Sequence, residues 1–195
     1  MIRDRGHRIL LAAAGVATVS CASLPPPPAS EHGFAGRFAL TVSGDDERRE
    51  NVSGRFALSV SHERVTLDLA TPLGSTVARI ETGPDGAQLS VPADGGLRVV
   101  RGGDPETLAQ QVLGWSLPVS GLPDWIEGRP AAARPYRLSR TPDGTELIEQ
   151  DGWDVRVEQR TQDGRVRRLA MRRPAAGAGT PAVALSILLD APESP

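Results

Sequence analysis

Cysteine, lysine and aromatic residues are scarce in this chain of 195 residues. It has one cysteine, Cys21, which excludes a disulfide within the chain. All 22 basic residues are arginines, and the formal net charge of −2 argues against nucleic acid as a partner. With only three tryptophans, three phenylalanines and one tyrosine, the sequence predicts an aliphatic interior.

Residues suited to catalysis or metal binding are equally few. His32 and His62 are the only histidines after the first 20 residues, and there is no second cysteine to complete a metal site. Asp45 and Asp46 fall in a charged loop and Asp124 on the polar side of a predicted helix, so no carboxylate pair has a pocket. We therefore predict a binding protein without cofactor or metal. A lipid hydrolase that depends on His62 is an alternative.

The first 20 residues have the features of an export signal. Three arginines precede an apolar run from Ile9 to Val19, which is shorter than the about 20 residues of a membrane-spanning helix. Cys21 follows directly, and a cysteine in this position resembles the lipobox of bacterial lipoproteins, in which it is acylated and becomes the mature N-terminus. We predict residues 1–20 as a lipoprotein signal peptide and Cys21 as the lipidation site.

Residues 21–35 are predicted to form a lipidated tether. Four consecutive prolines, Pro25–Pro28, favour an extended, semi-rigid spacer. The residue after Cys21 is Ala22, which by resemblance to the sorting rules of enteric bacteria favours the outer membrane. The chain is thus expected to be lipid-anchored there and to face the periplasm.

Short segments in which apolar and polar residues alternate recur along the rest of the chain. They predict eleven strands, at residues 37–42, 52–60, 65–70, 77–81, 89–91, 97–99, 136–140, 146–150, 153–160, 166–173 and 183–189. Regular spacing with short polar turns favours an antiparallel meander, and strong curvature is a usual way to avoid bare sheet edges. Residues 36–195 are therefore predicted to be one mainly β domain, an open and strongly curved antiparallel barrel.

Two short helices interrupt this β pattern. Asp104 as cap and Pro105 at the first helical position begin one helix, which Gly114 ends. Ser120 precedes the second, which ends at Gly128. We expect these helices to form a lid over one opening of the curved sheet.

The stretch RVTLDLATPLGSTVARIE, residues 64–81, predicts a hairpin whose turn contains Pro72, Leu73 and Gly74. Leu73 is left near the apex, where polar residues are usual because an exposed leucine gains nothing unless an apolar group meets it. From the residues alone, Leu73 either folds back onto the sheet or projects into solvent.

The inward-facing positions suit a cavity for flexible acyl chains as well as they suit a plain core. The candidate cavity and lid residues are Phe38, Leu40, Phe56, Leu58, Leu67, Leu69, Leu108, Val112, Trp115, Leu117, Trp125 and Ile126. A structural or scaffolding lipoprotein with a filled barrel core is the alternative.

Several motifs stand out along the chain: GRFAL at 36–40 and again at 54–58, RVTLDLATPLGST at 64–76, LGWSLPVSGLPDWIEGRP at 113–130 and QDGWDVRV at 150–157. Together they resemble the family of the outer-membrane lipoprotein acceptor LolB. The resemblance spans nearly the whole chain after Cys21 and keeps the order of the family's elements.

This resemblance implies an open barrel with a helical lid over an apolar cavity. It further implies a monomer that takes acylated lipoproteins from the periplasmic carrier LolA and places them in the inner leaflet of the outer membrane. The family's leucine in the PLGST loop corresponds to Leu73, which is expected to protrude and to help insert cargo. Residues 29–35 are too short to supply much of the N-terminal helix that the family carries.

Overall fold

The computed structural model describes residues 32–44, 49–177 and 180–191. The predicted signal peptide, Cys21 and residues 22–31 lie outside the described residues. In chain order the strands are β1 (His32–Ser43), β2 (Arg49–Val60), β3 (Val65–Ala70), β4 (Thr76–Gly83), β5 (Gly86–Ala93), β6 (Gly96–Gly102), β7 (Tyr136–Arg140), β8 (Glu146–Gln150), β9 (Trp153–Arg160), β10 (Val166–Arg173) and β11 (Ala182–Leu189). The helices α1 (Pro105–Leu113) and α2 (Leu122–Trp125) lie between β6 and β7. Each predicted strand and helix is present, but α2 ends at Trp125 and not at the predicted Gly128, because residues 126–128 form a turn.

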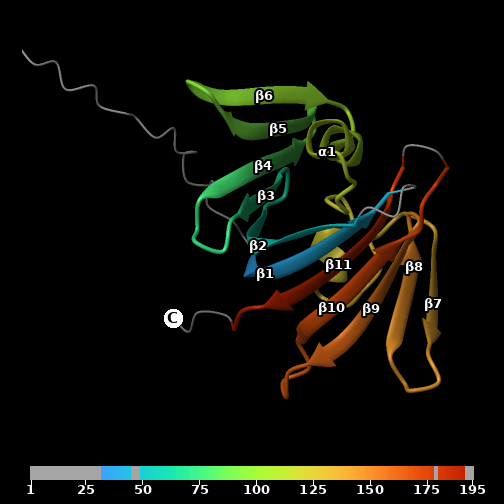
Figure 1. Ribbon diagram of the computed structural model, residues 1–195. Coiled ribbons are helices and arrows are strands. Elements are labelled where there is room, and N and C mark those ends of the chain that lie inside the picture. Colours follow the sequence, from blue (N-terminus) through green and yellow to red (C-terminus); the bar gives the residue numbers. More distant parts are fainter. Residues whose placement is uncertain (1–31, 45–48, 178–179, 192–195) are drawn as a thin grey trace, which may run out of the picture.

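All these strands belong to one antiparallel sheet in the order β6-β5-β4-β3-β2-β1-β11-β10-β9-β8-β7. The sheet curves strongly and stays open, because its edge strands β6 and β7 do not pair with each other (Figure 1). The predicted open, curved barrel is confirmed.

The curvature follows from the length of the two central strands. β3 pairs only with residues 55–60 of β2, whereas β11 pairs with residues 36–43 of β1. The two halves of the sheet therefore overlap only around the middle of the β1–β2 pair, and each half can turn independently toward the interior.

The repeated GRF sequence lies at this overlap. In the β1–β2 register, Gly36 is opposite Phe56, Arg37 is opposite Arg55 and Phe38 is opposite Gly54. Paired residues point to the same face, so each phenylalanine occupies the space that the opposite glycine leaves. The two arginines share the other face of the sheet, away from the interior.

The folded domain begins earlier than the sequence indicates. β1 starts at His32, not near residue 36, because residues 32–35 continue the ladder with β2, as in the pairs Gly33 with Ser59 and Phe34 with Leu58. The alternation is hard to see there because glycine and alanine occupy two of the four positions. Residues 32–35 are thus strand, not tether and not helix.

The buried apolar core is formed by residues between Leu40 and Leu189. A chain that begins at residue 22 therefore keeps every strand and the whole of this core. Within the described ranges, no helix is long and apolar enough to cross a membrane.

Candidate functional site

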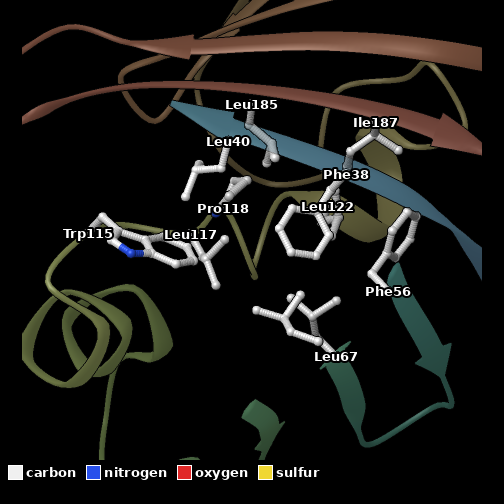
Figure 2. A pocket seen from close by; sticks show the side chains of 11 residues that line it. Phe38, Leu40, Phe56, Leu67, Trp115, Leu117, Pro118, Leu122, Leu185 and Ile187 are labelled. Carbon is white, nitrogen blue, oxygen red and sulfur yellow. The ribbon is translucent and has the colours of Figure 1, made fainter. Parts of the chain in front are cut away.

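The concave side of the sheet encloses a small apolar pocket (Figure 2). Its lining consists of Phe38, Leu40, Phe56, Leu67, Leu69, Trp115, Leu117, Pro118, Leu122, Leu185 and Ile187. The sheet residues come from β1, β2, β3 and β11, and the others from the segment between β6 and β7. Strands from both halves of the sheet thus meet one crossing segment at a purely apolar surface.

The volume of this pocket is only about 20 Å³, room for about one water molecule. If each methylene group takes roughly the space of one water molecule, a sixteen-carbon chain needs about sixteen times that space. The pocket of this structure is therefore far too small for such a chain.

Residues 105–128, which we call the cover segment, close it. α1 begins at Asp104, whose carboxylate accepts a hydrogen bond from the Thr107 N–H at 2.7 Å, and Pro105 follows at the first helical position. The helix ends at Gly114, which has a left-handed φ of 86°. Residues with a side chain rarely adopt this conformation, so glycine is usual at such a helix end. The predicted caps are confirmed.

Between Gly114 and α2 the cover segment is neither helix nor strand. All five residues from Trp115 to Val119 are buried, and Trp115, Leu117 and Pro118 point toward the strand residues of the pocket (Figure 2). The lid is therefore less helical at the pocket than expected: apart from Leu122, its lining residues belong to this irregular stretch.

One set of hydrogen bonds anchors Ser120, in the turn before α2, to α1. The Ser120 N–H donates to Glu106 Oε1 at 2.8 Å, and its hydroxyl donates to Oε2 at 3.1 Å. Burial raises the pKa of Glu106 above its ordinary range, against the opposing effect of the Ser120 hydrogen bond. Ser116 adds a bond to the Gln110 side chain at 3.0 Å.

The other anchor is Gln150 at the end of β8, which is 3% exposed. Its Oε1 accepts from the Trp125 indole N–H and from the Ala131 backbone N–H, both at 2.8 Å. Its Nε2 donates to the Ala131 carbonyl at 2.9 Å. One buried amide thus fixes α2 and the chain after it to the far half of the sheet.

The candidate cavity residues separate into two groups. Seven line the pocket: Phe38, Leu40, Phe56, Leu67, Leu69, Trp115 and Leu117. The other five lie around it and not in its lining, and of these Leu58, Leu108, Trp125 and Ile126 are buried core while Val112 is partly buried against that core. Pro118, Leu122, Leu185 and Ile187 complete the lining and were not among the candidates. Alternation in the last strand marks Leu185 and Ile187 as inward-facing, but only the β1–β11 pairing brings them here.

Leu73 is 97% exposed, the most exposed of the large apolar side chains in the described residues. The Gly74 N–H donates to the Thr71 carbonyl at 2.9 Å, and the Thr71 N–H to the Ser75 carbonyl at 2.8 Å. Gly74 has a φ of 93°, which closes the turn. Of the two conformations left open by the sequence, the leucine adopts the one that projects into solvent.

The same turn occurs twice more in this chain, with aspartate in place of leucine. Residues 141–145 and 161–165 repeat both backbone hydrogen bonds, with Asp143 and Asp163 in the third position. The hydroxyl of the turn's threonine donates to each of these aspartates and lowers its pKa. Leucine is therefore not required by the turn, and its presence at position 73 calls for a reason outside local folding.

His32 and His62 belong to no metal-binding cluster among the described residues. Within residues 32–44, 49–177 and 180–191, no three or more His, Cys, Asp or Glu side chains are placed to hold a metal ion. His62 lies exposed in the link between β2 and β3.

The fold and the pocket define the class of this protein. It is an open antiparallel β-barrel whose apolar interior is closed by a partly helical cover segment. Sequence comparison identifies the family within this class. Residues 31–187 match the family described as outer membrane lipoprotein LolB, and the chain belongs to this family.

Several proteins that align with most of this chain are named outer-membrane lipoprotein LolB. The protein of Bordetella petrii is 39% identical and the alignment covers 79% of this chain and 86% of the relative. The protein of Ralstonia nicotianae is 36% identical, with coverages of 80% and 78%, and that of Cupriavidus pinatubonensis is 32% identical, with coverages of 100% and 99%. A crystal structure of a LolA superfamily protein from Nitrosomonas europaea aligns over 83% of this chain and 85% of that chain at 10% identity, with a TM-score of 0.36, too low to bear on the argument.

Proposed function

We propose that this protein is a lipoprotein acceptor anchored in the outer membrane and facing the periplasm. It receives acylated lipoproteins from the periplasmic carrier LolA and inserts them into the inner leaflet of the outer membrane. Family membership supports this role. The observation that carries it is the combination of an apolar pocket under a cover segment with an exposed leucine that its turn does not require.

The pocket would shelter the acyl chains of cargo from water. Exposing a sixteen-carbon chain costs on the order of 12 kcal/mol at about 0.8 kcal/mol per CH₂, so transfer requires a continuous apolar path. Because the closed pocket is far smaller than such a chain, binding requires the cover segment to move away from the sheet. Residues 115–119 are the part that must leave.

Transfer of cargo in one direction does not require nucleotide hydrolysis. If affinity for the acyl chains rises from carrier to acceptor to bilayer, each step of 1.4 kcal/mol gives about a tenfold preference. We assign no catalytic residue and no cofactor to this process, and we expect the acceptor to act as a monomer.

Two further sites belong to this proposal. Cys21 would carry the lipid anchor, with residues 22–31 as the spacer. Pro72, Leu73 and Gly74 would form the membrane-insertion loop, in which burial of one leucine contributes about 1.5 to 3 kcal/mol, enough to bias an encounter with lipid but too little to anchor a protein.

An acyl chain labelled with a quencher tests the pocket. Titrated into the chain from residue 22 onward, it should bind saturably and quench the fluorescence of Trp115, which lines the pocket. Trp115→Phe should keep binding and lose most of the quenching, because Trp125 and Trp153 lie outside the lining.

The closed pocket also fits the alternative of a scaffolding lipoprotein with a filled core. Failure of the labelled chain to bind would favour that alternative. Acyl-ester turnover that is lost in His62→Ala would instead favour the hydrolase alternative.

A further inference from the structure

Arginines gather on the outer face of the sheet, opposite the pocket. Arg37 of β1 is directly opposite Arg55 of β2 and, on its other side, opposite Leu188 of β11, which is opposite Arg168 of β10. We call Arg37, Arg55 and Arg168 the arginine row. With strands about 4.8 Å apart, the row spans roughly 15 Å.

This arrangement is unfavourable for the fold alone. Like charges directly opposite each other on neighbouring strands destabilise a sheet. Arg55 is relieved by Asp190 at 3.6 Å, an exposed contact. Arg37 and Arg168 take part in no ion pair within the part of the chain that the structure describes.

Small, uncharged side chains hold most of the outward positions next to the row on its four strands. The neighbouring outward positions on β1, β2, β10 and β11 are held by Ala39, Thr41, Asn51, Ser53, Ala170, Ala184 and Ser186. Arg156 and Arg172 add two more cations, and Asp154 lies opposite Arg172. A basic face therefore exists on a chain whose net charge is negative.

The row lies at the end of the sheet from which Leu73 projects. Arg55 is opposite Ala70, the last residue of β3, and the turn with Leu73 begins at the next residue. In Figure 1 this turn, between β3 and β4, lies at the left, as does the end of β11 that carries Leu188.

We propose that the arginine row binds the phosphate groups of anionic phospholipids at the membrane surface that Leu73 enters. This inference rests on the proposed membrane role but not on the pocket. Guanidinium groups bind phosphate through two parallel hydrogen bonds, and the three arginines of the row are exposed on one face of the sheet. One apolar side chain gives marginal membrane binding, and a basic patch beside it supplies a second attraction.

A bilayer fits this face better than an acidic protein does. Beside the row lie the projecting Leu73 and the half-buried Leu188, which is between Arg37 and Arg168. A protein interface, by contrast, has a packed apolar core inside its polar rim. A bilayer accepts one inserted side chain among many phosphates without requiring a complementary shape.

Vesicle flotation tests the proposal with the chain from residue 22 onward. Wild type should bind vesicles of phosphatidylcholine mixed with phosphatidylglycerol more tightly than vesicles of phosphatidylcholine alone, and salt should remove the difference. Arg37→Gln with Arg168→Gln should weaken binding to the anionic vesicles about tenfold and leave binding to neutral vesicles unchanged.

The control removes two arginines elsewhere. Arg137→Gln with Arg140→Gln changes the net charge equally on the edge strand β7, and it should bind as wild type does. Equal binding by both double variants would overturn the proposal. So would a row variant that binds vesicles normally but fails to receive cargo from LolA, since the arginines would then contact a protein.

The acyl-chain quenching assay and the vesicle-binding assay together distinguish the proposed pocket function from the proposed role of the arginine row. Loss of quenching with vesicle binding intact would refute the pocket function alone. Normal quenching with no effect of the row variant on anionic vesicles would refute the arginine row alone.

Discussion

Gly54 lies beneath the ring of Phe38 on the neighbouring strand: a Cβ at residue 54 would be 2.9 Å from Phe38 Cε1 and 2.1 Å from the Ala70 carbonyl oxygen. The reciprocal pair repeats the geometry, since a Cβ at Gly36 would be 2.9 Å from Phe56 Cε1. Both phenylalanines line the pocket, so the two glycines determine how closely its walls approach.

Gly54→Ala should therefore destabilise the protein by about 2 to 3 kcal/mol, because the added methyl group meets a carbonyl that cannot move without breaking the ladder. Gly103→Ala is the matched control: a Cβ there has no atom within 4 Å, and the change should stay within about 0.5 kcal/mol. Urea unfolding of both variants measures this. Equal stabilities would show that the sheet yields at this point.

Leu73→Asp should preserve stability and impair membrane insertion. It copies the turns at 141–145 and 161–165, where aspartate accepts a hydrogen bond from the turn's threonine. Losing one inserted leucine should weaken vesicle binding by about ten- to a hundredfold, from about 1.5 to 3 kcal/mol. The measurements are thermal unfolding, vesicle flotation and cargo insertion.

Asp143→Leu is the reciprocal control, because it places a leucine in the same turn between β7 and β8. It should not restore insertion when combined with Leu73→Asp. Unimpaired insertion by Leu73→Asp would refute the assigned role of Leu73.

Gln150→Leu should cost about 3 kcal/mol of unfolding free energy. It leaves the Trp125 indole N–H and the Ala131 N–H and carbonyl buried without partners, at about 1 to 3 kcal/mol for each such group, partly relieved by movement. Gln159→Leu, at an exposed position, controls for the change of residue type. Urea unfolding followed by tryptophan fluorescence reports both. A loss below about 1 kcal/mol would mean that water satisfies these groups.

Glu106 should make stability depend on pH. Burial raises its pKa above the ordinary 4.5, so the folded protein holds the proton more tightly than the unfolded chain does. The stability from this group is fully present below about 4.5 and is lost as pH rises through the raised pKa. The unfolding free energy of Glu106→Gln relative to that of wild type should therefore be highest at neutral pH and should fall on acidification.

Unfolding free energies across this pH range test the expectation, with Glu158→Gln at an exposed position as control. A difference between wild type and Glu106→Gln that stays constant with pH would contradict it.

Local patterns in the sequence were enough for the eleven strands, both caps of α1 and the leucine at the turn apex. Each depends on neighbours in the chain: alternation sets a strand face, and a proline and a glycine set a turn. The start of β1 was missed because residues 32–35 contain too few large apolar side chains to show alternation.

Tertiary structure decided everything that joins distant segments. Only the register of β1 against β2 places each GRF glycine under the opposite phenylalanine and sets Arg37 beside Arg55. Only the pairing of β1 with β11 brings Leu185 and Ile187 into the pocket, and only packing against the sheet buries residues 115–119, which have no regular secondary structure. Register and closure depend on side chains far apart in sequence fitting one another, and no local pattern encodes that fit. The sequence alone therefore established the strands, the turn with Leu73 and the resemblance to the LolB family, whereas the closed pocket and the arginine row exist only in the folded sheet.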